Sequence, residues 1–167
     1  MITQKKTDLD LLSFISKTII SQQISNKAAV SIWRNVIKIR KLENLSLSEL
    51  LKKDKLNDIG ISRQKLNYIR EFNIAISQKK IDEVKMSTFN SQTLRKELLS
   101  YRGIGKWTLD MIEIFYLTNY NIWPEEDFVI KKMIKIINEK EKKSINYKKI
   151  FSPHLSILAL HLWKKGD

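Results

Sequence analysis

Cysteine is absent from this 167-residue chain, and proline and glycine are scarce, with two and four residues respectively. Without thiols the chain can form no disulfide, no thiolate zinc site, no thiol nucleophile and no iron–sulfur cluster. No apolar run reaches the ~18 residues that a membrane span needs, and residues 1–6 lack the apolar core of a signal peptide. These absences predict a soluble, intracellular protein.

Segments that alternate like a β-strand are also missing, whereas helical spacing recurs along the chain. Apolar residues three and four positions apart indicate helix faces within residues 14–20, 32–37, 66–76 and 155–162. Ser62 follows a turn and is a residue type that favours the helix N-cap. We predict an all-α fold, built as one compact unit or as two small subdomains that share a cleft, without repeats or linkers.

Positive charge dominates the composition, with 31 lysines and arginines against 18 acidic residues and a net charge of +13. Such an excess favours nucleic acid, an anionic membrane or an acidic protein as a partner, although an AT-rich genome produces a similar composition. Eight lysines and two glutamates lie between Lys131 and Lys149. A solvated helix face and a phosphate-facing patch both explain this segment.

The segment that indicates most about chemistry is residues 98–108, where Gly-Ile-Gly at residues 103–105 separates two helical stretches. We expect one helix to end near Ser100 and the next to begin near Lys106. Glycine lets the backbone approach a ligand closely, and the unpaired N–H groups that open a helix favour an anion. The turn therefore suits a phosphate, although a plain connection between two helices shows the same pattern.

Five segments in order resemble the helix–hairpin–helix DNA glycosylase superfamily, and they cover most of the chain. Residues 99–108 look like its hairpin, with Arg102 where proline is usual. Residues 19–25 and 59–65 are similar to its Gln-Gln turn and its Gly-Ile-Ser-Arg-Gln-Lys segment. Asp127 stands about twenty residues after the hairpin, where the family has an invariant aspartate. The fifth segment, residues 151–163, resembles the terminal helix and ends on its Leu-Trp pair, with Phe151, His154 and Leu155 in place of its other tryptophans and its arginine.

The resemblance implies two small helical subdomains that flank a DNA-binding cleft. One is expected to cover about residues 11–119, and the other about residues 120–167 together with the N-terminal segment. The match is to the catalytic domain of 3-methyladenine DNA glycosylase II, without the N-terminal mixed α/β domain of that family.

The resemblance also implies the reaction, in which a damaged base leaves the stack of double-stranded DNA and its glycosidic bond is hydrolysed. Relatives that also cut the strand carry a nucleophilic lysine two residues after the second hairpin glycine, where this chain has Trp107. We therefore expect a monofunctional glycosylase for alkylated purines of the 3-methyladenine type. It would act in base excision repair as a cofactor-free monomer, in the cytoplasm and at the nucleoid.

Asp127 is the expected catalytic carboxylate, because a negative charge stabilises the oxocarbenium character that the sugar gains as the bond breaks. An ordinary helix N-cap is the competing interpretation. By resemblance, Gln23 is the wedge that fills the vacated space, with Gln22 supporting it, although a polar capping pair also explains the two glutamines.

The remaining assignments by resemblance concern binding. The base pocket is assigned to Trp107, Trp123 and Phe151. Phosphate binding is assigned to Gly103, Gly105, Lys106 and Thr108. A monovalent cation is expected on the backbone carbonyls of Leu99, Tyr101 and Gly103.

Three other functions remain open on sequence grounds. The chain could be a non-catalytic helix–hairpin–helix DNA-binding module, although such modules usually have paired hairpins and no positioned aspartate. It could excise a neutral damaged base, or it could be a basic helical protein that binds RNA or an acidic partner. A protein that binds RNA or an acidic partner would need no catalytic role for Asp127.

Overall fold

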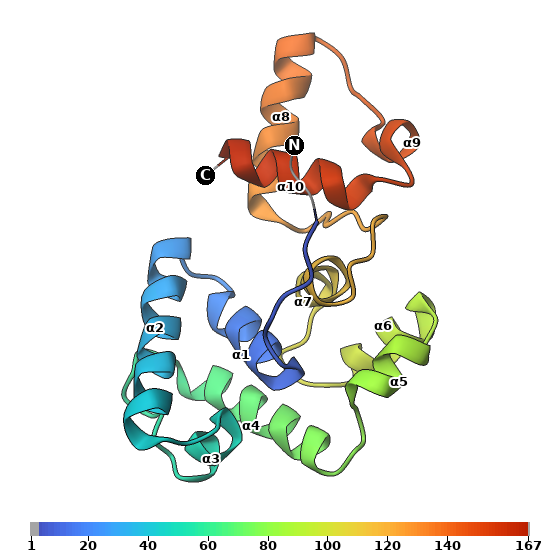
Figure 1. The fold of residues 1–167 in the computed structure, drawn as a ribbon. Helices are drawn as coiled ribbons and strands as arrows, with labels where there is room; N and C mark the ends of the chain where they lie inside the picture. Colours follow the sequence, from blue (N-terminus) through green and yellow to red (C-terminus); the bar gives the residue numbers. More distant parts are fainter. Residues whose placement is uncertain (1–3, 167) are drawn as a thin grey trace. The chain divides into compact units, whose positions relative to one another are not determined.

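The computed structural model describes residues 4–166, which form helices joined by loops, without a β-strand among them (Figure 1). This confirms the predicted all-α fold class. None of the helices in that part of the chain is long and apolar enough to cross a membrane. In chain order the elements are α1 (Leu11–Ser21), α2 (Asn26–Glu43), α3 (Leu47–Lys52), α4 (Arg63–Ser77), α5 (Glu83–Thr88), α6 (Ser91–Leu99), α7 (Lys106–Met111), the π-helical segment η1 (Ile112–Tyr116), α8 (Phe128–Glu141), α9 (Tyr147–Phe151) and α10 (Leu155–Gly166).

The chain divides into two compact units. The N-terminal unit comprises residues 8–105, and the C-terminal unit comprises residues 106–166 together with residues 4–7. The division falls between Gly105 and Lys106, at the end of the hairpin, whereas the sequence placed it near residue 119.

Most of the helices begin with a residue whose side chain caps the first turn. A cap accepts a hydrogen bond from a backbone N–H that has no partner within the helix, which contributes about 1 kcal/mol. Ser62 caps α4 by accepting from the N–H of Lys65 at 3.3 Å, as the sequence predicted. The other capping residues are Asp10, Ser25, Ser46, Asp82, Asn90, Asp127 and Asn146.

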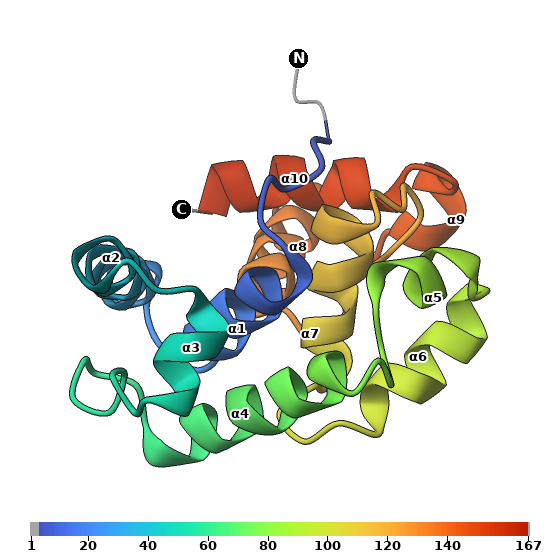
Figure 2. The same ribbon diagram turned by 60° about the horizontal axis from the view of Figure 1, so that its bottom comes forward.

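Helix α1 is the centre of the N-terminal unit and packs against α2, α3 and α4 (Figure 2). Its apolar residues Phe14, Ile15, Ile19 and Ile20 are buried, as the helical spacing predicted. Burying one such side chain contributes roughly 1.5–3 kcal/mol. This packing determines the position of the C-terminal end of α1, where the Gln-Gln turn begins.

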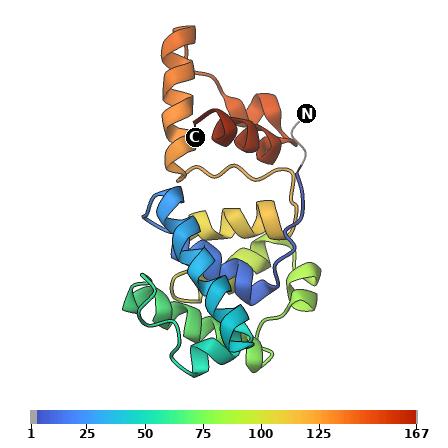
Figure 3. The same ribbon diagram turned by 60° about the vertical axis from the view of Figure 1, so that its left-hand side comes forward.

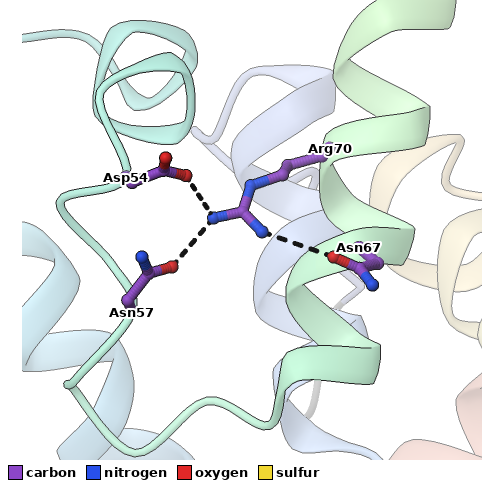
Figure 4. A network of polar contacts seen from close by, with 4 residues as sticks. All are labelled: Asp54, Asn57, Asn67 and Arg70. Atoms are coloured by element: carbon purple, nitrogen blue, oxygen red, sulfur yellow. Dashed lines mark hydrogen bonds and ion pairs between the residues drawn. The ribbon is translucent and has the colours of Figure 1, made fainter.

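A polar network ties the loop before α4 to that helix (Figure 4). The guanidinium of Arg70 donates to Oδ1 of Asp54 at 2.7 Å, to Oδ1 of Asn57 at 2.8 Å and to Oδ1 of Asn67 at 3.3 Å. Because Arg70 reaches back across the loop, the middle of α4 is held close to the residues that follow α3.

Helices α8 and α10, orange and red in Figure 3, pack together in the C-terminal unit. Ile130, Ala159 and Leu162 form the buried centre of their contact. Partly buried apolar side chains surround that centre: Trp123, Met133, Ile134, Ile137, Leu158 and Trp163. Residues 4–7 run beside η1, where the N–H of Thr7 donates to the carbonyl of Phe115 at 3.0 Å. The sequence did not indicate the π-helical segment.

Candidate active site

The two glycines of the hairpin between α6 and α7 have different surroundings. Gly103 has a φ of +83°, and a Cβ added there would lie 2.5 Å from Cδ2 of Tyr68. Gly105 has no heavy atom within 4 Å of where its Cβ would be. Ile104, which lies between them, is 4% exposed and anchors the turn. The fold therefore requires glycine at 103, whereas the space around Gly105 is open.

The residues that open α7 differ sharply in exposure. The side chain of Lys106 is 70% exposed, and its Nζ lies 3.7 Å from Oε1 of Glu126. Thr108 is 1% exposed. For Thr108, only the backbone N–H in the first turn of α7 is suited to the phosphate contact that the sequence assigned to it.

The carboxylate of Asp127 is buried in the C-terminal unit and is held by three hydrogen bonds. Asp127 caps α8 and is 8% exposed. Its Oδ1 accepts from the N–H of Ile130 at 2.9 Å, and its Oδ2 accepts from the indole N–H of Trp107 at 2.8 Å. A second indole, that of Trp163, donates to Oδ1 at 2.9 Å. Both oxygens therefore act as acceptors, which is the role of an ionised carboxylate.

Trp163 is a site residue that the sequence assignments missed. It lies in α10, 36 positions after Asp127, and its ring stacks on Phe115 with the centroids 5.7 Å apart. The available signal was the Leu-Trp pair in the segment that resembles the terminal helix of the family. Helical periodicity alone marks Trp163 only as one more apolar residue.

Two of the aromatic residues assigned to the base pocket contact a third aromatic residue rather than Asp127. Tyr147 stacks on Trp123 with centroids 6.2 Å apart and on Phe151 with centroids 6.4 Å apart. Trp123 and Tyr147 also line a cavity of about 530 Å³ beside α8 and α9. The carboxylate bonds to Trp107 instead, so the pocket roles of Trp123 and Phe151 stay predictions.

The two glutamates that precede Asp127 are engaged with lysines on the surface. Glu125 pairs with Lys148, and Glu126 lies beside Lys106. The hydrogen bond and the charge of Lys148 lower the pKa of the Glu125 carboxyl. Neither glutamate shares the buried, indole-bonded environment of Asp127, which separates the three neighbouring carboxylates.

The turn after α1 is joined to the hairpin within the N-terminal unit. Nε2 of Gln22 donates to the carbonyl of Gly103 at 2.8 Å. Gln23 follows with a left-handed backbone, at a φ of +56°, and its side chain is exposed. Gln22 thus supports the turn from which Gln23 projects into solvent.

The carbonyls proposed to hold a monovalent cation are partly occupied by hydrogen bonds. Gly103 accepts from Gln22, and Tyr101 accepts from the N–H of Ile104 at 3.2 Å. A carbonyl oxygen has two lone pairs, so each of these two retains one for a ligand. No group of three or more histidine, aspartate or glutamate side chains in residues 4–166 could hold a metal ion.

No protein-family model matches the chain. A Bacillus subtilis (strain 168) protein, provisionally named as a DNA-3-methyladenine glycosylase, is 27% identical over 114 residues, which are 65% of this chain and 40% of that protein. DNA-3-methyladenine glycosylase 1 of Schizosaccharomyces pombe is 23% identical over 157 residues, which are 89% of this chain and 69% of that protein. The solved structure of 3-methyladenine DNA glycosylase from Schizosaccharomyces pombe, in complex with abasic DNA, matches with a TM-score of 0.82 and 21% identity, over 98% of this chain and 84% of that chain.

The chain therefore shares its fold with this solved glycosylase structure. These two relatives and this structural neighbour are named as DNA-3-methyladenine glycosylases, provisionally so for the Bacillus subtilis protein, as the sequence resemblance predicted. The chain spans 40% of the length of the Bacillus subtilis relative. Within this fold, the hairpin and the carboxylate of Asp127 are the two features from which an activity can be argued.

Proposed function

We propose that this chain is a monofunctional DNA glycosylase that flips alkylated purines out of double-stranded DNA and excises them hydrolytically. One observation carries the proposal, namely the buried carboxylate of Asp127 with an indole N–H on each oxygen. An N-cap role accounts for the bond to the N–H of Ile130. It gives no reason for Trp107 and Trp163 to converge on the same group.

Neutral donors hold the carboxylate without cancelling its charge. The charge of Asp127 remains available to a developing cation, whereas the nearby Lys106 is paired with Glu126. When the glycosidic bond breaks, the electron pair leaves with the base and the sugar becomes cationic at C1′. A fixed anion in a partly dry site stabilises that cation more than water does. Water then adds to C1′ and loses a proton, for which the carboxylate is a suitable acceptor.

The contact with DNA is assigned to the hairpin and to the Gln-Gln turn. Gly105, the backbone N–H groups that open α7 and the exposed Lys106 are proposed to meet phosphate. Gln23 is proposed to enter the duplex. The hairpin carbonyls are proposed to hold the monovalent cation, and the protein to act as a monomer at the nucleoid.

The choice of lesion follows from the leaving group. An alkylated purine such as 3-methyladenine is already cationic, so it departs without a proton, and an indole face attracts it by ~0.5–2 kcal/mol. Hypoxanthine and uracil are neutral and need a proton or a strong hydrogen bond on departure. Both histidines, His154 and His161, are exposed, and the bonds to the Asp127 carboxylate come from tryptophans and a backbone N–H.

We expect excision of 3-methyladenine or 7-methylguanine to exceed excision of hypoxanthine or uracil by at least about tenfold. Single-turnover rates on duplexes that differ only in the target base measure this ratio. An Asp127→Asn sample, run in parallel, reports any contaminating glycosylase. Faster removal of a neutral base would refute the cation-based account, and release of no base at all would favour the DNA-binding module instead.

Strand cleavage should be absent, because position 107 carries an indole where bifunctional enzymes have an amine. Borohydride added during turnover should trap no covalent adduct between the protein and DNA above background. Trp107→Lys is the matched positive control, because it places an amine at that position. A strong adduct with the unmodified protein would show that another lysine attacks the sugar, and the monofunctional assignment would be wrong.

A further inference from the structure

A lysine from α4 holds the C-terminal end of α1. Nζ of Lys65 donates to the carbonyl of Ile20 at 2.8 Å and to the carbonyl of Gln22 at 2.6 Å. These carbonyls belong to the helix end and to the turn that follows it. The bonds cross 45 and 43 positions of sequence, so they result from tertiary packing and not from local capping.

The position of Lys65 matches an electrostatic need of α1. The last carbonyls of a helix lack partners within the helix and carry partial negative charge, which a cation stabilises. Helix α1 has no basic residue in its own last turn. Lys65 supplies that cation from another helix, and burial lowers the pKa of its ammonium group. A partly desolvated ammonium is costly in itself, so its bonds to the turn are the compensating interaction.

The same turn is fastened a second time, to the hairpin. The side chain of Gln22 donates to the carbonyl of Gly103, while its own carbonyl accepts from Lys65. The next residue, Gln23, has a left-handed backbone that residues other than glycine adopt only when their surroundings impose it. Its exposed side chain is the part of this turn that is free to enter DNA.

We propose that Lys65 is a positioning residue, which holds Gln23 in the conformation that fills the space left by an extruded nucleotide. The proposal rests on the proposed glycosylase function. A wedge works best when its turn is already ordered before the base leaves. A disordered turn would lose conformational entropy on insertion, and this cost would make flipping less favourable. Lys65 orders the turn in advance, through two charge-assisted hydrogen bonds.

The test uses the full chain and a duplex that carries 2-aminopurine at the target position. The fluorescence of 2-aminopurine rises when this base leaves the stack. Lys65→Met should lower the equilibrium constant for flipping about tenfold, as expected when charged hydrogen bonds are removed. Affinity for an unmodified duplex should change by less than about twofold, because phosphate contacts are untouched. Lys65→Arg keeps the charge and the donors, and it should recover most of the flipping.

Lys85→Met is the matched control. Nζ of Lys85 also donates to two backbone carbonyls, those of Lys79 and Lys80, in the turn that follows α4, and neither carbonyl belongs to the hairpin or to the Gln-Gln turn. The two lysine-to-methionine variants therefore remove the same kind of interaction from the same unit. Lys85→Met should leave flipping unchanged even where its thermal midpoint falls as much as that of Lys65→Met.

A double-mutant cycle separates positioning from general stability. If Lys65 acts through Gln23, Lys65→Met should have little further effect in a Gln23→Ala background. Additive losses, or wild-type flipping in Lys65→Met, would overturn the inference. If Lys65→Met does not fold, Lys65→Gln takes its place, and wild-type flipping by that variant would overturn the inference equally. A wild-type protein that extrudes no base would instead count against the proposed function.

Discussion

Asp127→Asn is expected to reduce base excision by more than about a thousandfold while DNA binding stays the same or tightens. Asparagine is as good an N-cap as aspartate, so the bond to the N–H of Ile130 can remain. The amide carries no charge, however, and offers one acceptor oxygen where the carboxylate offers two to Trp107 and Trp163. The developing sugar cation then loses its fixed counter-charge, whereas the binding of a polyanion loses a repulsive charge.

Asp82→Asn is the control that isolates catalysis from capping. Asp82 caps α5 by accepting from the N–H of Lys85 at 2.8 Å, in the way that Asp127 caps α8. It should therefore report what the loss of charge at an N-cap does to stability, with excision unchanged. For both variants we would measure the single-turnover excision rate, the thermal midpoint and the affinity for an abasic duplex. Near-normal excision by Asp127→Asn would eliminate the catalytic assignment.

Alanine at Gly103 should lower the stability of the protein, whereas alanine at Gly105 should lower its affinity for DNA. Gly103→Ala places a Cβ 2.5 Å from Cδ2 of Tyr68 at a φ of +83°, so we expect a loss of at least about 2 kcal/mol of unfolding free energy. Gly105→Ala meets no atom within 4 Å and should cost at most about 1 kcal/mol. The same methyl group nevertheless lies where the backbone is proposed to approach phosphate, so DNA affinity should fall about tenfold.

The DNA measurement for Gly105→Ala distinguishes phosphate binding from base recognition. Phosphate contacts carry no sequence information, so every duplex should be weakened by a similar factor. The dependence on salt should also become shallower, by about 0.9 log units per log unit of salt for each phosphate that the variant no longer neutralises. Unchanged affinity, or a weakening confined to particular sequences, would contradict the assignment of the hairpin to phosphate.

Local features of the fold followed from the sequence because their causes are local. Helical spacing of apolar residues indicated the buried faces of α1, α4 and α10, and Ser62 begins α4 through a bond to a residue three positions later. The Gly-Ile-Gly turn located the hairpin in the same way. Asp127 was found by its spacing from the hairpin, together with the resemblance to the family.

The partners of these residues depended on the tertiary structure, because periodicity shows which face is buried but not which side chain meets it. The bonds of Trp163 to Asp127 and of Lys65 to Gln22 join residues 36 and 43 positions apart. No spacing rule connects such pairs. Trp107 was predicted from the sequence, but only the packing of the helices aims its indole N–H at the carboxylate. The sequence thus determined which residues are proposed to carry the chemistry, and the packing determined which of them hold one another in place.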